Sequence, residues 1–424
     1  MTKELYELKQ AEERLILVGV EQEGGRSAME MEACLDELEE LVKTAGGTAV
    51  GRMIQRRERV HPGHYLGKGK LEELKVMLAA FDATGIVCDD ELSPAQLKNM
   101  EQALETKVMD RTIVILDIFA ARALSGEGKI QVELAQLKYR LSRLTGLGTS
   151  LSRLGGGIGT RGPGEKKLET DRRHIKERIA ELNREAGEIR THRELLRAQR
   201  KKKGTPVISL VGYTNAGKST LINTLTDAGV LAENKLFATL DTTTRQVKLP
   251  NGSEILLTDT VGFIQKLPHH LVQAFRATLE EMKYADILLH VVDASNPERE
   301  EQMRVVYQTL KELGCEDTPV ITVYNKMDLQ PELPLPQDGQ ARDMVRISAA
   351  RGEGLDGLLE SVEQLLQSFR KTMRALVPYT EGALIGWLHG RCEILQEEHT
   401  ADGVRLEAAV DEEAANRLER YRIE

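Results

Sequence analysis

In the first 125 residues the pattern of apolar and polar positions alternates between one typical of strands and one typical of helices. Short apolar runs, each about as long as a buried strand, are separated by segments with helical periodicity. The apolar runs lie at 14–20, 48–54, 85–88 and from 108 onward, and the helical segments lie at 29–44 and 71–81. Ser93 and Pro94 are typical of a helix N-cap and a first helical position. We therefore expect a small α/β domain with a mainly parallel sheet over residues 1–128.

Two segments with heptad-like apolar spacing follow this domain. Their apolar positions are Leu134, Leu137, Leu141 and Leu144 in the first, and Ile175, Ile179, Leu182, Ala186 and Ile189 in the second. Two such helices can pair antiparallel. The connection between them is rich in glycine and cations. We expect an antiparallel helical hairpin arm over 129–203 with a glycine-rich basic tip at 145–168.

The charge of the chain is distributed unevenly. The net charge is −9, but residues 138–203 hold 19 Lys or Arg against 8 Asp or Glu, a net of +11, which leaves −20 for the remainder. A basic module in an acidic protein favours a polyanionic partner such as RNA. The alternative is a solvated helix face with many ion pairs. Glycine lets a backbone approach a phosphate ribbon closely. The predicted RNA contacts are Arg153, Arg161, Lys166 and Lys167.

The second half of the chain predicts a larger α/β domain over 204–371 and a small α+β domain over 372–424. The larger domain has apolar runs at 207–211, 254–258, 320–324 and 344–347 and a helix at 355–369. Three prolines between Leu329 and Ala341 predict a shortened or missing helix. The small domain has helical patterns at 382–389 and 411–420 and strand patterns at 392–396 and 403–409.

A phosphate-binding loop opens the larger domain. Residues 212–219 read G-Y-T-N-A-G-K-S, after an apolar strand and before a helix start. In this context backbone N–H groups and the helix N-terminus favour phosphate. Lys218 is expected on the β- and γ-phosphates and Ser219 on Mg²⁺. The predicted contacts of this loop are Gly212, Tyr213, Thr214, Asn215, Ala216, Gly217, Lys218, Ser219 and Thr220.

Two further segments are expected around the terminal phosphate. Asp259 and Gly262 form D-x-x-G at the end of a predicted strand. Asp259 would hold Mg²⁺ through a water, and the Gly262 N–H would sense the γ-phosphate. One threonine of 236–245 should close over the ion directly. Thr239 is favoured, and Thr242, Thr243 and Thr244 are the alternatives.

A guanine-specific motif, N-K-M-D, follows at 325–328. Asp328 can accept hydrogen bonds from the N1–H and 2-amino group, Asn325 supports the loop, and the Lys326 stem can lie along the base. Ser348 and Ala349, after another strand, would offer a backbone N–H to O6. Adenine would leave Asp328 without hydrogen-bond donors, so GTP is the expected substrate. The expected cofactor is Mg²⁺, held at the phosphates.

Position 263 bears on the rate of hydrolysis. Many GTPases carry Gln there to orient the attacking water, and this chain has Phe263. Phenylalanine makes no hydrogen bond to water. We expect the isolated protein to turn over slowly, on the order of 10⁻³ s⁻¹ or below, with acceleration of about 10³–10⁵ by a partner.

Several classes of protein are disfavoured by the sequence. The four cysteines are isolated, which fits a reducing compartment and no structural zinc. No signal peptide and no run of about 18 apolar residues occurs, so we expect a cytoplasmic protein without a membrane span. The loop at 65–70, Y-L-G-K-G-K, is a weak candidate for a second nucleotide site, for ATP, in the N-terminal domain.

The chain resembles the HflX family of translational GTPases. The resemblance is carried by G-G-G-I-G-T-R-G-P-G-E at 155–165, L-E-T-D-R-R at 168–173, Y-L-G-K-G-K at 65–70, V-E-L-A-Q-L at 132–137 and F-A-T-L-D at 237–241. It implies an α/β fold in which a P-loop GTPase domain is combined with an N-terminal α/β domain, a helical hairpin arm and a small C-terminal α+β domain. It also implies binding to the large ribosomal subunit, with the tip reaching toward the peptidyl-transferase region.

The family resemblance assigns further roles and has two departures. The resemblance gives Thr239 the Mg²⁺-sensing role. Members of the family carry a hydrophobic residue at the position of Phe263, and some are credited with ATP binding through the N-terminal domain. Family members commonly have Pro at 242, where this chain has Thr. Lys166 and Lys167 stand where the pair is often Thr-Gln, which makes this tip more cationic.

The sequence therefore predicts a GTP-hydrolysing factor that acts on the large ribosomal subunit and dissociates or rescues stalled ribosomes. The alternative from another class is an ATP- or GTP-dependent, helicase-like remodeler of rRNA. A third reading is a passive RNA-binding scaffold with a structural GTP. A tRNA-modifying GTPase is disfavoured, because the chain has neither a cysteine pair nor a one-carbon cofactor site.

Overall fold

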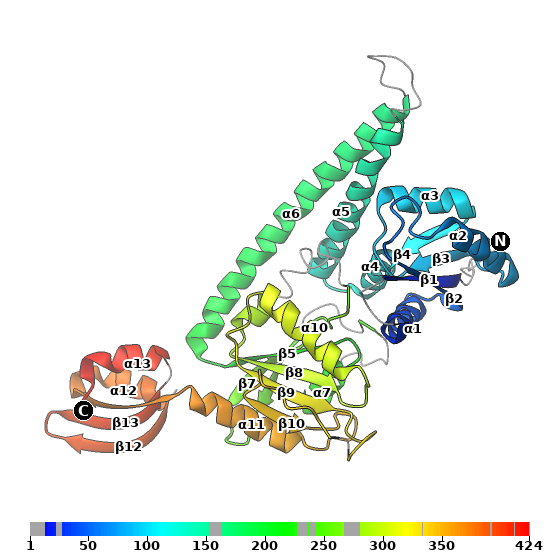
Figure 1. Ribbon diagram of the computed structural model, residues 1–424. Coiled ribbons are helices and arrows are strands. Elements are labelled where there is room, and N and C mark those ends of the chain that lie inside the picture. Colours follow the sequence, from blue (N-terminus) through cyan, green and yellow to red (C-terminus); the bar gives the residue numbers. More distant parts are fainter. Residues whose placement is uncertain are drawn as a thin grey trace, which may run out of the picture.

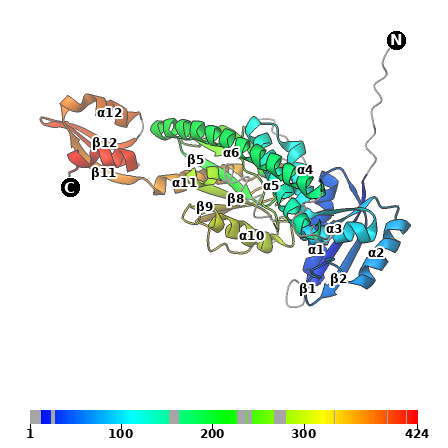
Figure 2. The same cartoon turned by 90° about the horizontal axis from the view of Figure 1, so that it is seen from above.

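The computed structural model describes residues 13–22, 28–151, 163–226, 236–237, 243–266, 280–332, 334–390, 392–410 and 412–423. Three sheets and one pair of long helices build this part of the chain (Figure 1). The N-terminal sheet and the small C-terminal module lie at opposite ends of the molecule, with the largest sheet between them (Figure 2).

The N-terminal sheet is parallel, as the alternation of strands and helices predicts. Its strand order is β2-β1-β3-β4. The elements are β1 (Arg14–Gln22), α1 (Ala28–Thr44), β2 (Thr48–Arg57), α2 (Lys68–Ala80), β3 (Gly85–Cys88), α3 (Pro94–Leu104), β4 (Lys107–Asp110) and α4 (Arg111–Arg122). Ser93 caps α3 in a capping box with Gln96, which confirms the predicted helix start.

The arm consists of α5 (Gly126–Leu151) and α6 (Pro163–Lys203), which lie side by side (Figure 1). Leu182 is fully buried between them, and Arg178 of α6 forms a two-pronged pair with Glu133 of α5 at 2.8 and 3.0 Å. The expected loop at 145–168 is too long, because α5 continues to Leu151 and α6 begins at Pro163. Proline suits a first helical position, and isolated glycines cost a helix only about 1 kcal/mol each.

The base of the arm is fastened to the N-terminal sheet by the carboxylate of Asp110, which is fully buried. One carboxylate oxygen accepts from the Ile113 N–H at the start of α4 and from the Tyr139 hydroxyl of α5. The other accepts from the Leu92 N–H and, at 2.5 Å, from Arg143 of α5. Tyr139 and Arg143 therefore fix the direction in which α5 leaves the sheet.

The largest sheet has the order β10-β9-β8-β5-β7-β6, with only β6 antiparallel to its neighbour among the described strands. Its elements are β5 (Val207–Gly212), α7 (Lys218–Thr226), β6 (Thr244–Lys248), β7 (Glu254–Thr258), a 3₁₀ turn η1 (Glu280–Tyr284), β8 (Ile287–Asp293), α10 (Arg299–Glu312), β9 (Val320–Asn325), β10 (Asp343–Arg346) and α11 (Leu355–Ser368). The described residues between Leu329 and Ala341 contain no helix, as their prolines predict.

The C-terminal module is a three-stranded antiparallel sheet, β11-β13-β12, covered by helices. Its elements are β11 (Lys371–Val377), a 3₁₀ turn η2 (Tyr379–Glu381), α12 (Gly382–His389), β12 (Glu393–Thr400), β13 (Gly403–Val410), α13 (Glu412–Leu418) and a 3₁₀ turn η3 (Glu419–Tyr421). The sequence did not predict β11, which follows α11 almost directly. The four domain boundaries expected from the sequence stay predictions.

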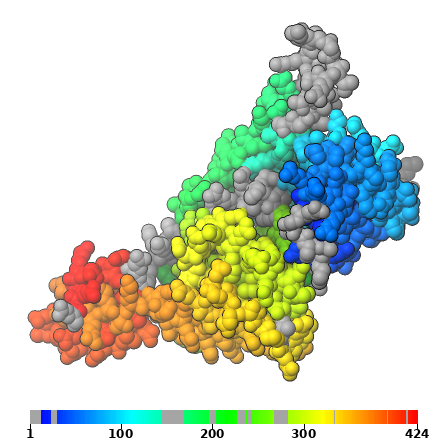
Figure 3. All heavy atoms as spheres, viewed as in Figure 1, coloured from blue at the N-terminus to red at the C-terminus, as the bar shows by residue number. Residues whose placement is uncertain are grey.

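One apolar cluster continues from the N-terminal sheet through the start of the arm into the central sheet. It includes Leu38 of α1, Ile115 of α4, Val132 of α5, Val211 of β5 and Leu288 of β8. In the space-filling view the blue N-terminal part lies directly beside the yellow-green central part (Figure 3). In the part of the chain that the structure describes, no helix has the length and apolar character needed to cross a bilayer.

We expect Asp110→Asn to lower the free energy of unfolding by about 3 kcal/mol, because it leaves Arg143 without its buried counter-charge. Urea unfolding followed by circular dichroism measures the loss. The matched control is Asp117→Asn on the exposed side of α4, which should change the free energy by less than about 0.5 kcal/mol. Equal effects of the two variants would contradict the role assigned to Asp110.

Candidate nucleotide-binding site

The phosphate loop connects the end of β5 to the start of α7, as the motif predicts. Gly212 and Gly217 have φ values of +150° and +98°. A Cβ on Gly212 would lie 2.3 Å from the Val291 carbonyl oxygen, and one on Gly217 would lie 2.2 Å from the Asn325 amide nitrogen. Only glycine fits at these two positions, so the loop is closely packed against the neighbouring strand ends.

The Lys218 ammonium lies inside this loop. Nζ donates to the carbonyl oxygens of Gly212 at 3.0 Å and Tyr213 at 2.8 Å. Burial lowers the pKa of Lys218 to about 8, against the opposing effect of Asp259. A cation that donates to neutral backbone carbonyls is favourably placed to exchange them for phosphate oxygens, which pair with it far more strongly.

Two oxygen ligands converge beside Lys218. The Ser219 hydroxyl donates to the Asp259 carboxylate at 3.1 Å, and Asp259 is fully buried just after β7. A hydroxyl and a carboxylate are the hard oxygen donors that Mg²⁺ prefers, so these residues fit the ion. Of the four threonines considered, Thr239 and Thr242 lie outside the described residues. Thr243 accepts from the Asp259 N–H through its carbonyl, and Thr244 pairs with Thr258 across β6 and β7.

The segment after Asp259 pairs with the phosphate loop. The Phe263 N–H donates to the Gly212 carbonyl at 3.1 Å, and the Thr214 N–H donates to the Phe263 carbonyl at 2.8 Å. A Cβ on Gly262 would lie 3.0 Å from both Lys218 Nζ and Thr214 Cα, so the backbone approaches the loop closely there. The Phe263 ring is buried in the apolar cluster shared with the N-terminal sheet. Movement of this segment would therefore affect the loop and the N-terminal sheet together.

The N-K-M-D motif follows β9 and connects three segments. The Asn325 amide donates to the Ala216 carbonyl at 2.9 Å and accepts from the Ala349 N–H at 2.9 Å. The Asp328 carboxylate accepts from the Ser348 hydroxyl at 2.7 Å. The structure therefore brings the predicted residues of both motifs to one edge of the sheet.

The side chain of Tyr213 has a role that the motif does not indicate. Its hydroxyl donates to the Glu37 carboxylate of α1 and accepts from the Gln265 N–H at 2.8 Å. Burial, followed by the nearby Glu37 charge, raises the pKa of Tyr213 well above its usual value. Tyr213 thus ties the phosphate loop to the N-terminal sheet and to the segment after Gly262.

Other predicted sites have different outcomes. Arg153 and Arg161 lie outside the described residues, and Lys166 and Lys167 lie within α6 with side chains outside the description. In the loop at 65–70, the Gly67 N–H donates to Gln55 at 2.8 Å and Lys70 pairs with Glu73 at 2.7 Å. These polar groups are engaged locally rather than directed at a ligand.

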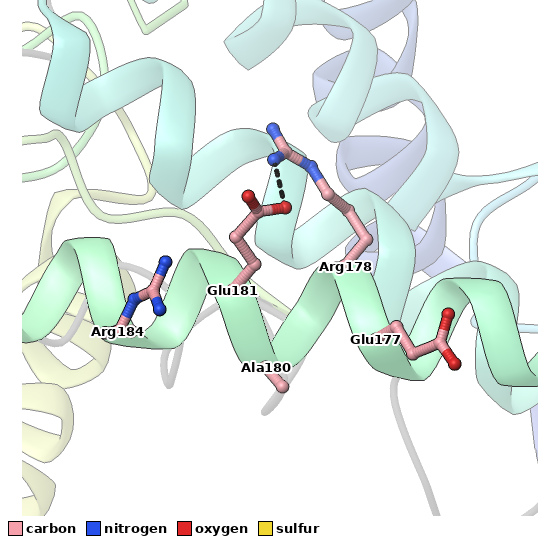
Figure 4. Close-up of a pocket in the computed structure, with 5 residues that line it drawn as sticks. All are labelled: Glu177, Arg178, Ala180, Glu181 and Arg184. Atoms are coloured by element: carbon pink, nitrogen blue, oxygen red, sulfur yellow. Dashed lines mark hydrogen bonds and ion pairs between the residues drawn. The ribbon is translucent and has the colours of Figure 1, made fainter.

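A shallow hollow lies on α6, far from the nucleotide motifs. It is lined by Glu177, Arg178, Ala180, Glu181 and Arg184 (Figure 4). Arg178 pairs with Glu181 at 2.7 Å as well as with Glu133. Because this guanidinium is already paired twice, the hollow is part of the fastening of the arm and not a candidate ligand site.

A phosphate loop after the parallel strand β5, D-x-x-G after its neighbour β7 and N-K-x-D after β9 together define a P-loop GTPase. Four family models match the chain: "GTP-binding GTPase N-terminal" at 32–120, "GTP-binding GTPase Middle Region" at 122–200, "50S ribosome-binding GTPase" at 207–326 and "HflX C-terminal domain" at 336–423. The chain belongs to the HflX family of GTPases and hydrolyses GTP. The resemblance seen in the sequence is thereby confirmed.

Relatives match over nearly the whole chain. The GTPase HflX of Lacrimispora saccharolytica is 59% identical over 97% of this chain and 96% of its own. That of Caldanaerobacter subterraneus subsp. tengcongensis is 50% identical over 99% and 96%, and that of Escherichia coli is 42% identical over 82% of this chain and 83% of its own. A solved GTP-binding protein from Sulfolobus solfataricus in complex with GDP is 26% identical over 84% of this chain and 99% of its own, with a TM-score of 0.42.

His290 provides a pH-dependent test of the packing beneath the site. It lies in β8, 1% exposed, edge-on to the Tyr307 ring at 5.0 Å. Burial lowers its pKa from 6.5 to about 4, although Asp338 opposes the effect. Between pH 6.5 and about 4, His290 therefore binds a proton in the unfolded chain but not in the folded chain. The free energy of unfolding should fall by about 3 kcal/mol as the pH drops through this range.

Urea unfolding at pH 7, 6, 5 and 4 measures this dependence. The free energy of unfolding of His290→Gln should depend less steeply on pH between 6.5 and 4, because the contribution of this side chain is lost. An unchanged slope in the variant would show that His290 is not the responsible group.

Proposed function

We propose that the protein is a GTP-switched factor that binds the large ribosomal subunit through its arm and dissociates or rescues stalled ribosomes. The proposed domains keep the bounds expected from the sequence, which are 1–128, 129–203, 204–371 and 372–424. Support for a ribosomal target comes from the printed description of the family model over 207–326 and from the net charge of +11 over residues 138–203. The expected location is the cytoplasm. The comparisons give no support to an ATP site, and we do not propose one.

The observation that carries the proposal is that both nucleotide-sensing segments contact the N-terminal α/β part of the chain, one at a helix and the other at the residues after β3. Phe237, in the segment before β6, packs edge-on against Phe119 of α4, with ring centroids 4.7 Å apart. Lys266, four residues after Gly262, pairs with Asp89 and, at 2.5 Å, with Asp90, which both follow β3. A change of either segment on hydrolysis would therefore act on the N-terminal sheet.

Lys266 belongs to a larger group of charges, the interdomain charge cluster, which consists of Glu37, Asp89, Asp90, Arg111 and Lys266. Arg111, 2% exposed, pairs with Glu37 and, at 2.7 Å, with Asp89. Burial would lower the pKa of Lys266, but Asp89 and Asp90 outweigh it and the pKa is raised. Lys266 is therefore charged at neutral pH, and its removal would leave the buried Asp89 with Arg111 alone and take from Asp90 its partner in the cluster.

The same N-terminal sheet holds the arm. Asp110, at the end of β4, binds Tyr139 and Arg143 of α5. The proposed path of coupling thus runs from the segment after Gly262, through Lys266 and the interdomain charge cluster, to the sheet and the base of the arm. GTP would stabilise one arrangement of this path and hydrolysis would release it.

The site residues receive the roles that the motifs predict. Lys218 binds the β- and γ-phosphates, and the Gly262 N–H senses the γ-phosphate. Ser219 and Thr239 would hold Mg²⁺ directly and Asp259 through a water; the ion would neutralise charge on the phosphates. Asn325, Lys326, Asp328, Ser348 and Ala349 bind the guanine. Phe263 supplies no hydrogen bond to water, so the ribosome would have to provide the group that orients it.

The guanine pocket is tested by Asp328→Asn. This variant replaces an acceptor by a donor and should weaken GTP binding at least about a hundredfold while increasing affinity for xanthosine triphosphate. Equilibrium titration with both nucleotides measures the change. Unaltered GTP affinity would mean that the guanine pocket is assigned wrongly.

The ribosomal target is tested by GTP turnover with and without purified large subunits. We expect turnover on the order of 10⁻³ s⁻¹ or below alone and a stimulation of at least about 10³ with subunits. No stimulation would favour a passive scaffold. RNA unwinding supported by ATP without GTP would favour the remodeler instead.

The tip is tested in the same assay by neutralising Arg153, Arg161, Lys166 and Lys167 to glutamine. The concentration of subunits needed for half-maximal stimulation should rise about tenfold or more and depend less steeply on salt. The matched control neutralises four exposed cations outside the arm, Lys75, Arg304, Lys311 and Arg342. Equal losses in both variants would mean that the tip has no special part in binding.

A further inference from the structure

Asp293 lies beside the guanine motif but belongs to none of the recognised motifs. It ends β8 and is the register partner of Asn325 at the end of the adjacent parallel strand β9. Its carboxylate is 14% exposed and accepts from the Lys326 ammonium at 2.6 Å. A lysine expected to lie along the purine is thus already paired with a neighbouring strand.

The Asp293 carboxylate is itself held in place. Its other oxygen accepts from the Ser295 N–H at 3.0 Å and from the Ser295 hydroxyl at 2.6 Å. The next residue, Ala294, donates its N–H to the Asn325 carbonyl at 3.0 Å. Because the strand end and the turn after it both fix this side chain, the acceptor for Lys326 has a defined position.

The backbone of Lys326 is unusual in a way that fits this pairing. Its φ is 62°, in the left-handed region that a residue with a Cβ adopts at a cost in free energy. Such a conformation persists where the surrounding contacts determine it. Here Asn325 is bonded to Ala216 and Ala349 on one side, and the ion pair with Asp293 holds the side chain on the other.

We propose that Asp293 is a positioning residue for guanine nucleotides and acts through Lys326. By fixing the ammonium at the end of β8, it orders the long stem so that its apolar face can lie along the purine. Without this anchor, the nucleotide would have to order a flexible side chain when it binds. The inference rests on the proposed placement of guanine among Asn325, Lys326 and Asp328.

The role has a distinctive kinetic consequence. GDP and GTP share the base, so loss of the anchor should weaken both to the same extent, about five- to tenfold. Asp293 is not among the residues that contact phosphate or Mg²⁺ in the proposed site, so turnover at saturating GTP should stay within about twofold of the original value. A merely structural role would not produce equal losses of affinity together with preserved turnover.

The test is a double-mutant cycle with Asp293→Asn and Lys326→Met. Asparagine keeps the shape and the acceptor for Ser295 but removes the counter-charge, and methionine keeps the apolar stem without the ammonium. The affinities for GDP and GTP are measured by equilibrium titration of the full chain. Each single variant should lose about five- to tenfold, and the double variant should be no weaker than Lys326→Met alone.

Losses that multiply in the double variant would overturn the inference, since Asp293 would then act independently of Lys326. Tighter binding by Asp293→Asn would also overturn it, because the ion pair would then compete with the nucleotide. Asp317→Asn, an exposed carboxylate in the turn before β9, controls for the change in net charge and should leave both affinities unchanged. The melting temperature without nucleotide shows whether Asp293→Asn folds normally.

The experiment separates this inference from the function on which it rests. If Asp328→Asn weakens guanine nucleotides and Asp293→Asn does not, only the role of Asp293 fails. If Asp328→Asn also has no effect, the placement of guanine itself is wrong and the role of Asp293 falls with it.

Discussion

The pairing of Lys266 with buried carboxylates of the N-terminal sheet is the interaction on which the proposed coupling depends. Asp89 is fully buried and Arg111 is 2% exposed, so neither has water to replace a lost partner. An uncompensated buried charge is strongly destabilising, about 3–5 kcal/mol when one partner is removed. Displacement of Lys266 would leave the three carboxylates of the cluster with Arg111 as the one cation of the cluster that remains, which favours a rearrangement over a small shift. Interactions of this kind favour two discrete arrangements over a continuous range, which is what a switch requires.

Apolar packing and the contacts at the base of the arm connect the same three parts of the molecule. Phe119 and Phe237 place α4 against the segment before β6, and Phe263 is buried in the cluster that the two sheets share. At the same edge of the N-terminal sheet, where Asp110 ends the strand next to β3, Asp110 holds α5. The carboxyl edge of the N-terminal sheet is thus in contact both with the segment after Gly262 and with the base of a cationic arm. We infer that it acts as the intermediate body between GTP and the RNA-facing tip.

The sequence predicts the parts of this design that are local in the chain. Gly212, Lys218 and Asn325 carry recognisable motifs because phosphate and guanine impose fixed residue types at fixed spacing. The contacts of Lys266 with Asp89 and Asp90 join residues 177 and 176 positions apart, and nothing in the local pattern of either segment indicates the pairing. The short strands β6 and β11 were missed because most of their residues are exposed or only partly buried and give no clear apolar run. Strand β8 was also missed, although residues 287–292 are almost all apolar and precede Asp293. A signal for Asp293 therefore did exist, since a carboxylate at the end of a buried parallel strand lies at the edge of the sheet where ligands bind.

The most direct test is the distance between the arm and the GTPase sheet in the two nucleotide states. Spin labels are attached at Glu177→Cys on α6 and Lys311→Cys on α10, and the distance between them is measured by pulsed electron paramagnetic resonance. The background is Cys392→Ser, because the other three native cysteines are buried. The distance distribution should differ between GDP and a non-hydrolysable GTP analogue, and the difference should vanish in Lys266→Met but persist in the control Lys283→Met. Identical distributions with both nucleotides, or a difference that survives Lys266→Met, would contradict the coupling.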